Sequence, residues 1–369
     1  MKIIDYTIDA VMGRMTRLVN RYNKYSLGKK MREKITKNLN ELETRRYLTK
    51  EQKEEVDNFY ISMIGKPVPL YCHEYFYSRT NFFSKDYVPK DFYTVELLPR
   101  ANFYRFTPAY DDKNIYDILF AGENVAHPIL KNMNGYYYFE GRAVSEEEAL
   151  DLCKNLEKVI IKPALEKSGS GVRLLTVKDG VTNVDGRTLK NLFDEYKRNF
   201  LIQKCVKQHK DLAALNPTSV NTLRILSYRS GMEVLILYSV IRIGRSGQVI
   251  DNQCAGGIST IITKDGKLGK TAFGGYSEDN VLVTDTGITL DGYQLPSYDK
   301  TIDFVKRLHL KLPYLNIVGW DISIEENGEP ILIEFNTHPG LSQSAFCSGM
   351  GENTERIIRE LWHRPNTRF

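Results

Sequence analysis

The chain has few of the residues that build disulfide frameworks or metal clusters. Its five cysteines are scattered, odd in number and without a Cys-x-x-Cys pair, which argues against a disulfide scaffold or a zinc knuckle and favours a reducing cytoplasm. The six histidines include no His-x-x-x-His pair, so a histidine-built metal site is not expected. No apolar run approaches the ~20 residues that a membrane helix needs. The N-terminus also lacks the apolar core and cleavage site of a signal peptide.

A chain of 369 residues is too long for one ordinary core, so two or three domains are expected. Its composition, with 42% hydrophobic and 26% charged residues, is that of a globular protein. The net charge of +5 is uneven, because residues 1–50 hold 13 Lys and Arg against 5 Asp and Glu. This excess is either the solvated face of helices or a basic platform for an acidic partner, an anionic membrane or a polyanionic glycan. No motif selects nucleic acid, and none is expected as a partner.

The order of elements predicts an α+β fold. Residues 1–66 have the apolar spacing of helices and form a basic helical region, and residues 67–124 form a mixed, aromatic-rich domain without a clear period. Later apolar runs, bounded by Gly, Asn and Asp, predict strands. We expect two further subdomains there, over residues 125–206 and 207–369.

Individual helices and strands follow from local signals. Thr49 begins a capping box, and Ser145 caps a helix predicted over Val144–Val159. Helices are also predicted near residues 187–198 and 298–311. The strands are expected in the segments KVIIKPAL, VRLLTV, NFLIQKCV, TLRILSYRS, MEVLILYSVIRIG and GISTIIT.

A hairpin near the C-terminus carries polar residues in its strands. Asn327-Gly328 favours a two-residue type I′ turn, and this turn would place Asp321 directly across from Glu334. Asn336 would lie two residues further on the same face. The other face would be wholly apolar, with Trp320, Ile322 and Ile324 opposite Phe335, Ile333 and Ile331.

Two opposed carboxylates repel each other unless one is protonated or a cation lies between them. Mg²⁺ takes oxygen ligands, usually one or two carboxylates together with water and substrate phosphates. Asp321, Glu334 and the Asn336 amide oxygen fit that need. The alternative is a solvent-facing pair on a half-exposed sheet.

A second segment joins a lysine at a strand end to a loop of small residues. Lys162 ends one strand, and Ser168, Gly169, Ser170 and Gly171 form the loop before the next. Small residues let backbone N–H groups approach phosphate oxygens, and the lysine adds a point charge. The alternative is a flexible hairpin with an exposed lysine. No G-x-x-x-x-G-K-[ST] motif is present.

A third segment is a strand exit at Gln203, Lys204 and Val206. Backbone groups at such an exit can bind an adenine edge while apolar side chains cover the ring faces, although the segment is equally consistent with a plain core strand.

Two arginines, Arg224 and Arg242, lie inside apolar strands, and Asn252 precedes a double glycine. A buried arginine either pairs with a structural carboxylate or clamps a phosphate or carboxylate.

These segments, in this order, resemble the ATP-grasp superfamily. More narrowly, NPTSVNTLRI, DNQCAGGI, GWDISI and ILIEFNTHPG resemble its sugar-transfer-associated proteins, over about residues 125–362. The resemblance implies an ATP-grasp fold, in which two α+β subdomains clasp ATP and residues 125–206 form the lid. It also implies an ADP-forming ligase, in which ATP phosphorylates a carboxylate and an amine attacks the acyl phosphate.

The resemblance further implies roles for the candidate residues. Asp321, Glu334 and Asn336 would hold Mg²⁺, usually two ions. Arg224, Arg242 and Asn252 would form the catalytic set, with the two arginines stabilising the transferring phosphoryl group. A set of cofactor-binding residues would contact ATP: Lys131, Lys162, Ser168, Gly169, Ser170, Gly171, Gln203, Lys204 and Val206. Within that set Lys131 is the expected first ATP lysine, and Gln203 stands where the superfamily commonly has an acidic residue.

The expected function is a carboxylate–amine ligase for cell-surface polysaccharide or another glycoconjugate, with small-molecule acid and amine substrates. One alternative is an ATP-grasp phosphotransferase without ligation. The other is a non-catalytic nucleotide- or glycan-binding protein.

Overall fold

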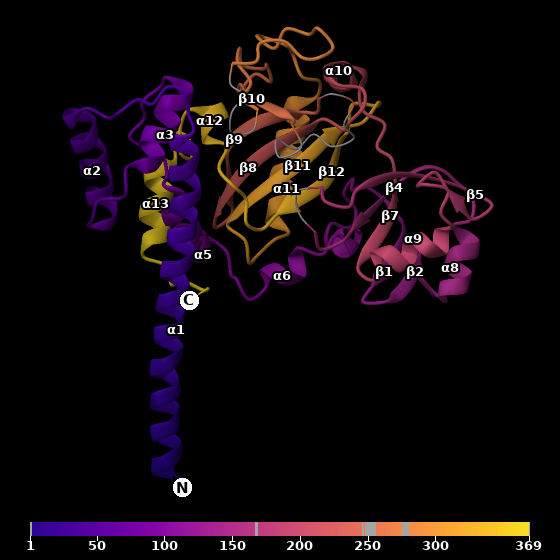
Figure 1. Ribbon diagram of the computed structural model, residues 1–369, viewed down its shortest axis with the longest axis horizontal. Coiled ribbons are helices and arrows are strands. Elements are labelled where there is room, and N and C mark those ends of the chain that lie inside the picture. The colour runs from indigo at the N-terminus through magenta and orange to yellow at the C-terminus, as the bar shows by residue number, and fades with distance from the viewer. Residues whose placement is uncertain (1, 167–168, 246, 248–255, 275–279, 369) are drawn as a thin grey trace. The chain divides into compact units, whose positions relative to one another are not determined.

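The computed structural model describes residues 2–166, 169–245, 247, 256–274 and 280–368 (Figure 1). The chain divides into two compact units. Unit 1 comprises Met1–Phe106, Tyr314–Ile317 and Gly340–Phe369, and unit 2 comprises Thr107–Pro313 and Val318–Pro339.

Unit 1 is helical. Its elements are α1 (Lys2–Asn40), α2 (Lys50–Ile64), α3 (Tyr71–Thr80), α4 (Lys90–Phe92), the π-helix η1 (Tyr93–Leu97), α5 (Leu98–Ala101), α12 (Gln343–Phe346) and α13 (Thr354–Trp362). The predicted capping box at the start of α2 is confirmed, because Gln52 N donates to Thr49 Oγ1 and Thr49 N donates to Gln52 Oε1. Ile35 and Leu39 of α1 are buried against Cys72, Tyr75, Phe76 and Tyr87.

The C-terminal segment returns to unit 1 instead of staying with the residues that precede it. The Gln343 side chain accepts from Val88 N at 2.7 Å and donates to Val88 O at 3.0 Å. Gly349 lies so close to Asp86 O that a Cβ would approach it to 2.1 Å. The sequence placed this segment in a domain over residues 207–369, but its hydrogen bonds tie Gly340–Phe369 to unit 1.

Unit 2 begins with the short elements α6 (Thr107–Tyr110), η2 (Lys113–Ile115) and α7 (Tyr116–Leu119). A seven-stranded sheet follows, in the order β3-β2-β1-β7-β4-β5-β6. Its strands are β1 (Pro128–Met133), β2 (Tyr136–Phe139), β3 (Arg142–Val144), β4 (Leu156–Pro163), β5 (Arg173–Lys178), β6 (Val181–Thr182) and β7 (Phe200–Lys204). The helices α8 (Glu146–Leu152) and α9 (Leu189–Tyr196) cover its apolar face through residues that include Ala149, Leu192 and Phe193.

One predicted helix is shorter than expected. Ser145 caps α8 as predicted, since Glu148 N donates to Ser145 Oγ at 3.1 Å. The helix ends at Leu152, and β4 begins at Leu156, within the range that we assigned to the helix. The apolar residues near Val159 pair with β5 and β7 in the sheet, and this tertiary pairing overrides the helical spacing of the local sequence.

The second sheet of unit 2 has the order β10-β9-β8-β11-β12. Its strands are β8 (Thr222–Ser230), β9 (Glu233–Ile243), β10 (Ile258–Ile262), β11 (Ile317–Ile324) and β12 (Pro330–Asn336). The helix α10 (Lys210–Leu215) precedes β8, and α11 (Tyr298–Leu310) lies between β10 and β11 in sequence. Every residue of β11 is buried. The six strands predicted from the sequence correspond to β4, β5, β7, β8, β9 and β10, and are confirmed.

The turn between β11 and β12 differs from the type I′ turn that we predicted. Gly328 N donates to Glu325 O at 2.8 Å, and Glu325 N donates to Glu329 O at 2.9 Å. Gly328 has φ +82°, whereas Asn327 is not among the residues with positive φ. A type I′ turn needs positive φ at both central residues, so the connection is a three-residue loop closed by a left-handed glycine.

A bulge then restores the predicted register. Near the loop, Ile322 pairs with Leu332 and Ile324 with Pro330, so the predicted pairs with Ile333 and Ile331 are wrong. The register shifts between Asp321 and Ile322, leaving Ile333 as the extra residue of β12. Beyond the shift, the predicted pairs Asp321–Glu334 and Trp320–Phe335 are confirmed.

None of the helices in the described part of the chain is both long enough and apolar enough to cross a membrane.

Candidate active site

The carboxylate pair predicted from the hairpin lies on one wall of a cavity in unit 2. Asp321 on β11 and Glu334 on β12 are direct cross-strand partners, and both line the cavity. The Asp321 side chain is 10% exposed and the Glu334 side chain 24%. Within the described residues, no three His, Cys, Asp or Glu side chains gather into a metal cluster. A cation here would therefore need the Asn336 amide, water or substrate oxygens as further ligands.

Asp321 is held by two guanidinium groups and an amide. Arg224 on β8 donates from Nη2 to Asp321 Oδ2 at 3.0 Å, and its Nε lies 2.7 Å from Oδ1. Arg242 on β9 donates from Nη1 to Oδ1 at 3.3 Å. Asn336 Nδ2 donates to Oδ2 at 3.3 Å. The structure thus joins both predicted arginines and two of the predicted metal ligands in one network.

The two arginines differ in their access to the cavity. Arg242 lines it, whereas Arg224 is buried in the sheet and is not part of the lining. Burial, together with the adjacent Arg242, lowers the pKa of the Arg224 guanidinium, and the Asp321 carboxylate opposes this shift. Arg224 therefore acts on the cavity through Asp321, and Arg242 is placed to contact a bound molecule.

Glu334 pairs with a lysine that the sequence did not point to. Lys113 Nζ, in the 3₁₀-helix η2, lies 3.4 Å from Glu334 Oε1 and donates to Glu166 O at 2.6 Å. The side chain is only 6% exposed, and it lines the cavity. Lys131, which we expected as the first ATP lysine, does not line this cavity, and its Nζ lies 2.6 Å from both carboxylate oxygens of Asp117.

Lys162 occupies the position predicted for a phosphate-binding lysine. It is at the end of β4, it is buried, and it lines the cavity. Burial lowers the pKa of the Lys162 ammonium to about 8; the Glu334 carboxylate opposes this shift, and the Lys113 ammonium adds to it. The charge on this lysine is therefore sensitive to pH in a range where a free lysine stays protonated.

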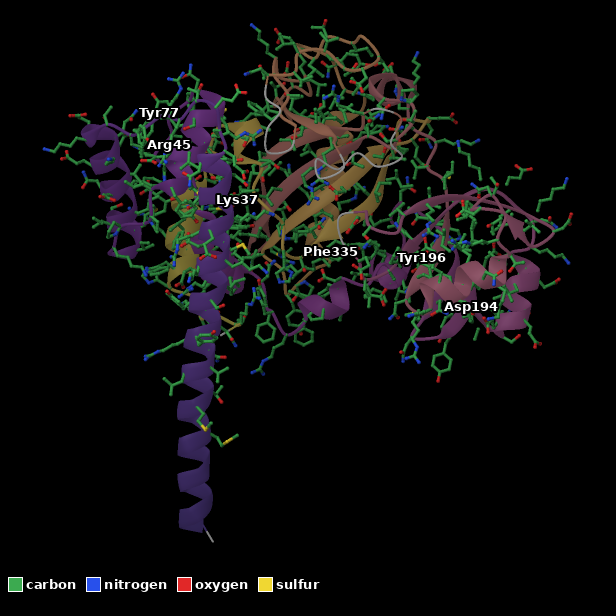
Figure 2. All side chains as sticks on the ribbon, viewed as in Figure 1. Lys37, Arg45, Tyr77, Asp194, Tyr196 and Phe335 are labelled. Carbon is green, nitrogen blue, oxygen red and sulfur yellow. The ribbon has the colours of Figure 1, made fainter. Side chains whose placement is uncertain are left out.

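The small-residue loop folds back on the end of β4. Gly169 and Ser170 line the cavity, while Ser168 lies outside the described residues. Gly171 has φ +71°, and a Cβ there would lie 2.9 Å from Pro163 Cγ. Tyr196, labelled in Figure 2 at the end of α9, donates to Gly171 O at 2.5 Å. These contacts hold the end of the loop beside Lys162.

The end of β7 and the residues that follow it form another wall of the cavity. Gln203, Cys205 and Val206 line it, and Gln203 is 5% exposed. Lys204, which we predicted as a cofactor-binding residue, is exposed and is not part of the lining, because successive side chains of a strand point to opposite faces. The apolar side chains that complete this wall are Ile160, Val172, Leu174 and Ile333.

The loop before β8 closes another side of the cavity, through Pro217, Thr218, Ser219 and Val220. Asn221 anchors the loop, because its Nδ2 donates to Leu212 O at 2.7 Å and to Asn216 O at 2.9 Å. The loop packs closely against Gly244, because a Cβ at that position would lie 2.4 Å from Ser219 Oγ. Asn252, predicted as catalytic, lies outside the described residues.

The model of a family described as sugar-transfer-associated ATP-grasp proteins matches residues 93–357. The chain belongs to the sugar-transfer-associated ATP-grasp family. The mixed α+β fold with two sheets after a helical N-terminal region is the ATP-grasp fold that the sequence predicted. No curated protein matches the chain.

Solved structures with similar folds include three enzymes. An L-amino acid ligase from Bacillus licheniformis is 10% identical, with a TM-score of 0.40 over 71% of this chain and 50% of that one. The biotin carboxylase domain of the Hydrogenobacter thermophilus 2-oxoglutarate carboxylase is 12% identical, with a TM-score of 0.42 over 73% of this chain and 49% of that one. The N5-carboxyaminoimidazole ribonucleotide synthetase of Thermotoga maritima is 12% identical, with a TM-score of 0.40 over 72% of this chain and 52% of that one. This ATP-grasp chain spans about half the length of each.

The donor set of this ATP-grasp cavity suits a polyanion with a divalent cation. Four cationic side chains, those of Lys113, Lys162, Arg224 and Arg242, surround two carboxylates. A nucleotide triphosphate would balance the remaining positive charge, and the carboxylates offer oxygen ligands to Mg²⁺. Lys113 could have been predicted only from its position shortly before the lid subdomain. No rule of residue spacing distinguishes Lys113 from Lys131 as the cavity lysine.

Proposed function

We propose that this chain is an ATP-dependent, ADP-forming ligase that joins a carboxylate to an amine through an acyl phosphate. The observation that carries the proposal is the meeting of Lys113, Lys162 and Arg242 with the Asp321–Glu334 pair around one cavity. Phosphoryl transfer needs positioning and charge stabilisation more than a protein nucleophile, and this cavity offers cations and metal ligands.

In the first step, a carboxylate oxygen of the acid substrate attacks the γ-phosphorus, and the bond to the β,γ-bridging oxygen breaks to release ADP. Lys113 and Lys162 hold the phosphates, and Arg242 stabilises the charge on the transferring group. In the second step, the amine nitrogen attacks the acyl carbon. Phosphate leaves with the former carboxylate oxygen, and the nitrogen loses a proton as the amide forms.

Asp321, Glu334 and Asn336 would hold Mg²⁺, which neutralises phosphate charge during the transfer. We expect two ions, as the resemblance implied. In the structure the Asp321 charge is balanced by Arg224 and Arg242. Arg224 keeps the carboxylate oriented toward β12, so it prepares Asp321 as a ligand without touching the nucleotide.

The nucleotide base would lie between Ile160, Val172 and Leu174 and the strand exit at Gln203 to Val206. Apolar side chains cover the ring faces, and backbone groups at the exit supply polar contacts to its edge. Gln203 replaces an acidic side chain, so its amide can donate as well as accept.

The family's association with sugar transfer supports a proposal for the substrate class. We propose that the product belongs to cell-surface polysaccharide or a related glycoconjugate, such as an amino acid amide-linked to an amino sugar. Small-molecule acids and amines are then the partners of the cavity.

A screen of acid and amine pairs for ADP release tests the proposal. The ligase requires both substrates, and mass spectrometry should detect the amide product. Glu334→Gln should lose at least 100-fold in turnover while keeping its circular dichroism spectrum. ADP release that needs only one co-substrate would instead indicate a phosphotransferase. Absence of ATP binding by calorimetry with Mg²⁺ would refute the nucleotide assignment.

A further inference from the structure

The N-terminal half of α1 presents apolar side chains that unit 1 does not cover. Figure 1 shows this half of the helix extending beyond α2, α3 and α13. Its large apolar side chains are more than half exposed: Met12 at 59%, Met15 at 57%, Leu18 at 64%, Val19 at 54%, Tyr22 at 70% and Tyr25 at 62%. Exposed apolar side chains that gather on one helix face mark an interaction surface.

These side chains do share one face. The helix is continuous from Lys2 to Asn40. At about 100° per residue, the exposed apolar positions fall within one arc of roughly 140° of the helix circumference. This arc, which we call the apolar face, holds every large apolar residue between Met12 and Tyr25.

The polar residues of the same stretch form two further arcs. Its charged residues are all basic, and their positions fill an arc of roughly 80° that borders the apolar face: Arg14, Arg17, Arg21 and Lys24. The uncharged residues Thr16, Asn20 and Asn23 lie on the remaining arc. The stretch therefore joins an apolar face to positive charge that no acidic residue within it offsets.

Unit 1 contacts α1 on another side of the helix. Lys24 forms an ion pair with Glu96 at 2.8 Å, and further along the helix Ile35 and Leu39 are buried in unit 1. At about 100° per residue, these contacts lie on the side roughly opposite to the apolar face. The apolar face is therefore directed away from unit 1, so it can lie against an extended surface.

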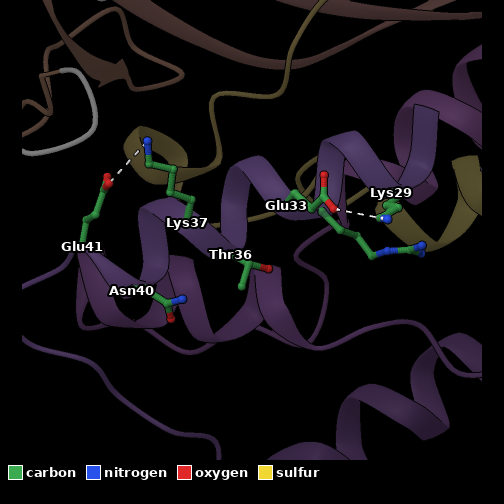
Figure 3. Close-up of a pocket in the computed structure, with 7 residues that line it drawn as sticks. Lys29, Glu33, Thr36, Lys37, Asn40 and Glu41 are labelled. Carbon is green, nitrogen blue, oxygen red and sulfur yellow. Dashed lines mark ion pairs between the residues drawn. The ribbon is translucent and has the colours of Figure 1, made fainter. Parts of the chain in front are cut away.

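The C-terminal half of α1 has no such apolar face among its described residues. Figure 3 shows a shallow pocket on this half, lined by charged residues that pair along the helix: Lys29 with Glu33 at 3.8 Å and Lys37 with Glu41 at 3.7 Å. Exposed apolar side chains and unbalanced positive charge thus occur together in the N-terminal half.

We propose that residues 12–25 bind the surface of a bilayer that contains anionic phospholipids. A helix that lies in the plane of such a surface inserts its apolar face at the boundary of headgroups and acyl chains, and its basic residues lie among the headgroup phosphates. Tyr22 and Tyr25 suit that boundary, because the tyrosine ring is apolar and its hydroxyl group polar. Arg14 and Arg21 border the apolar face, where a long basic side chain can extend to the phosphates.

Charge favours an anionic bilayer over other partners. Two copies of the segment would bring like charges together, with no acidic residue in the segment to offset them. Nucleic acid would neutralise the basic residues, but a phosphate backbone would leave the apolar face exposed to water. An anionic bilayer satisfies both features of the segment at once.

Flotation of the full chain with lipid vesicles tests the inference. The chain should bind vesicles of equal parts phosphatidylcholine and phosphatidylglycerol roughly tenfold or more tightly than vesicles of phosphatidylcholine alone, and added salt should weaken the binding. R14Q/R21Q should weaken binding to the mixed vesicles roughly tenfold or more, because it removes two positive charges. The control R14K/R21K keeps those charges and should bind as the wild type does.

The apolar face has its own pair of variants. M15Q/L18Q keeps the net charge but replaces two apolar side chains, so it should weaken binding to the mixed vesicles roughly tenfold or more. The matched control T16Q/N20Q changes two positions on the uncharged arc and should bind as the wild type does. Circular dichroism and thermal unfolding check that all variants are folded.

Tryptophan fluorescence tests which face enters the bilayer. Brominated phosphatidylcholine in the mixed vesicles should quench the tryptophan added by Leu18→Trp, because this position lies on the apolar face. The tryptophan added by Asn20→Trp should not be quenched. The wild type, with its two native tryptophans, gives the background signal. Equal quenching at both positions would overturn the proposed orientation.

The inference fails if the wild-type chain does not float with the mixed vesicles, or if M15Q/L18Q or R14Q/R21Q floats as well as the wild type. Sedimentation equilibrium examines the competing occupant. A wild-type dimer that M15Q/L18Q makes monomeric, without flotation of either protein, would assign the apolar face to a second copy. ADP release, measured without vesicles, tests the proposed ligase activity separately.

Discussion

At the scale of single residues, the cavity depends on how charges are paired in the absence of nucleotide. Asp321 lies against Arg224 and Arg242, and Glu334 lies against Lys113. A carboxylate that is already oriented by a guanidinium loses little entropy when it receives a metal ion. The residue pairs therefore prepare the cavity for a charged ligand.

Lys113 and Lys131 form a natural comparison, since both are buried lysines paired with a carboxylate. Lys113→Met should lower kcat/KM for ATP about 100-fold or more, because it removes a cation from the cavity. Lys131→Met should destabilise the fold, because Asp117 loses its partner, but should change kcat/KM less than about tenfold. Steady-state kinetics and thermal unfolding separate the two effects. If Lys131→Met and Lys113→Met lowered kcat/KM equally, Lys131 would have to be assigned to the nucleotide site as well.

The lowered pKa of Lys162 predicts that nucleotide binding depends on pH. Because its pKa in the folded protein is about 8, this lysine loses its charge as pH rises through that value, whereas the unfolded chain keeps it to about 10.5. The Kd for ATP should rise roughly tenfold between about pH 7.5 and about pH 9, with proton uptake on binding. Calorimetry in buffers of different ionisation enthalpy measures both. Lys162→Arg, which stays protonated, should flatten the profile; an equally steep profile in that variant would assign the titration to another group.

At the scale of elements, the β11–β12 hairpin combines two irregularities that compensate. The three-residue loop shifts the register by one, and the bulge at Ile333 shifts it back before Asp321. Ile333 also lines the cavity next to Glu334. Bulges commonly re-aim side chains near functional sites, and this one serves both the register and the cavity wall.

Two glycines of this hairpin should respond differently to alanine. Gly319 has no room, since a Cβ would lie 2.8 Å from Arg224 Nη1 and 2.7 Å from Pro339 Cβ. Gly319→Ala should displace Arg224 and lower kcat at least tenfold, with a stability cost of about 1–3 kcal/mol. Gly328 has φ +82° in the loop, so Gly328→Ala should cost about 1 kcal/mol or more in stability and leave kcat unchanged. Kinetics and urea unfolding distinguish them. An unchanged kcat in Gly319→Ala would show that the Arg224–Asp321 contact is not needed.

At the scale of the whole molecule, the candidate site belongs entirely to unit 2. A ligand that binds only the folded state stabilises it by about 2.7 kcal/mol at a concentration of 100 times its Kd. ATP with Mg²⁺ should therefore raise the Tm of the transition that reports unit 2 and leave a separate unit 1 transition in place. Differential scanning calorimetry resolves the two. The shift should disappear with EDTA or in Glu334→Gln, and a shift that survives both would exclude the carboxylate pair as the metal site.

Much of the site could be predicted because its signals are local. A strand-end lysine, a small-residue loop and polar residues at alternating positions of a hairpin are visible in short stretches. The pairing of Asp321 with Glu334 was predicted with the wrong turn, and it holds because the bulge cancels the error. Lys113 and the role of Arg224 depend on contacts between segments far apart in sequence, which no local spacing encodes.

The sequence by itself determined the fold class, most of the strands and the carboxylate pair, because alternation, capping and turn chemistry act over a few residues. Only the tertiary structure decided which lysine reaches the cavity, which arginine lies behind Asp321, and that the C-terminal segment returns to the helical unit. Those outcomes depend on which segments pack together. Long-range burial and charge pairing set that choice, and they are properties of the folded chain as a whole.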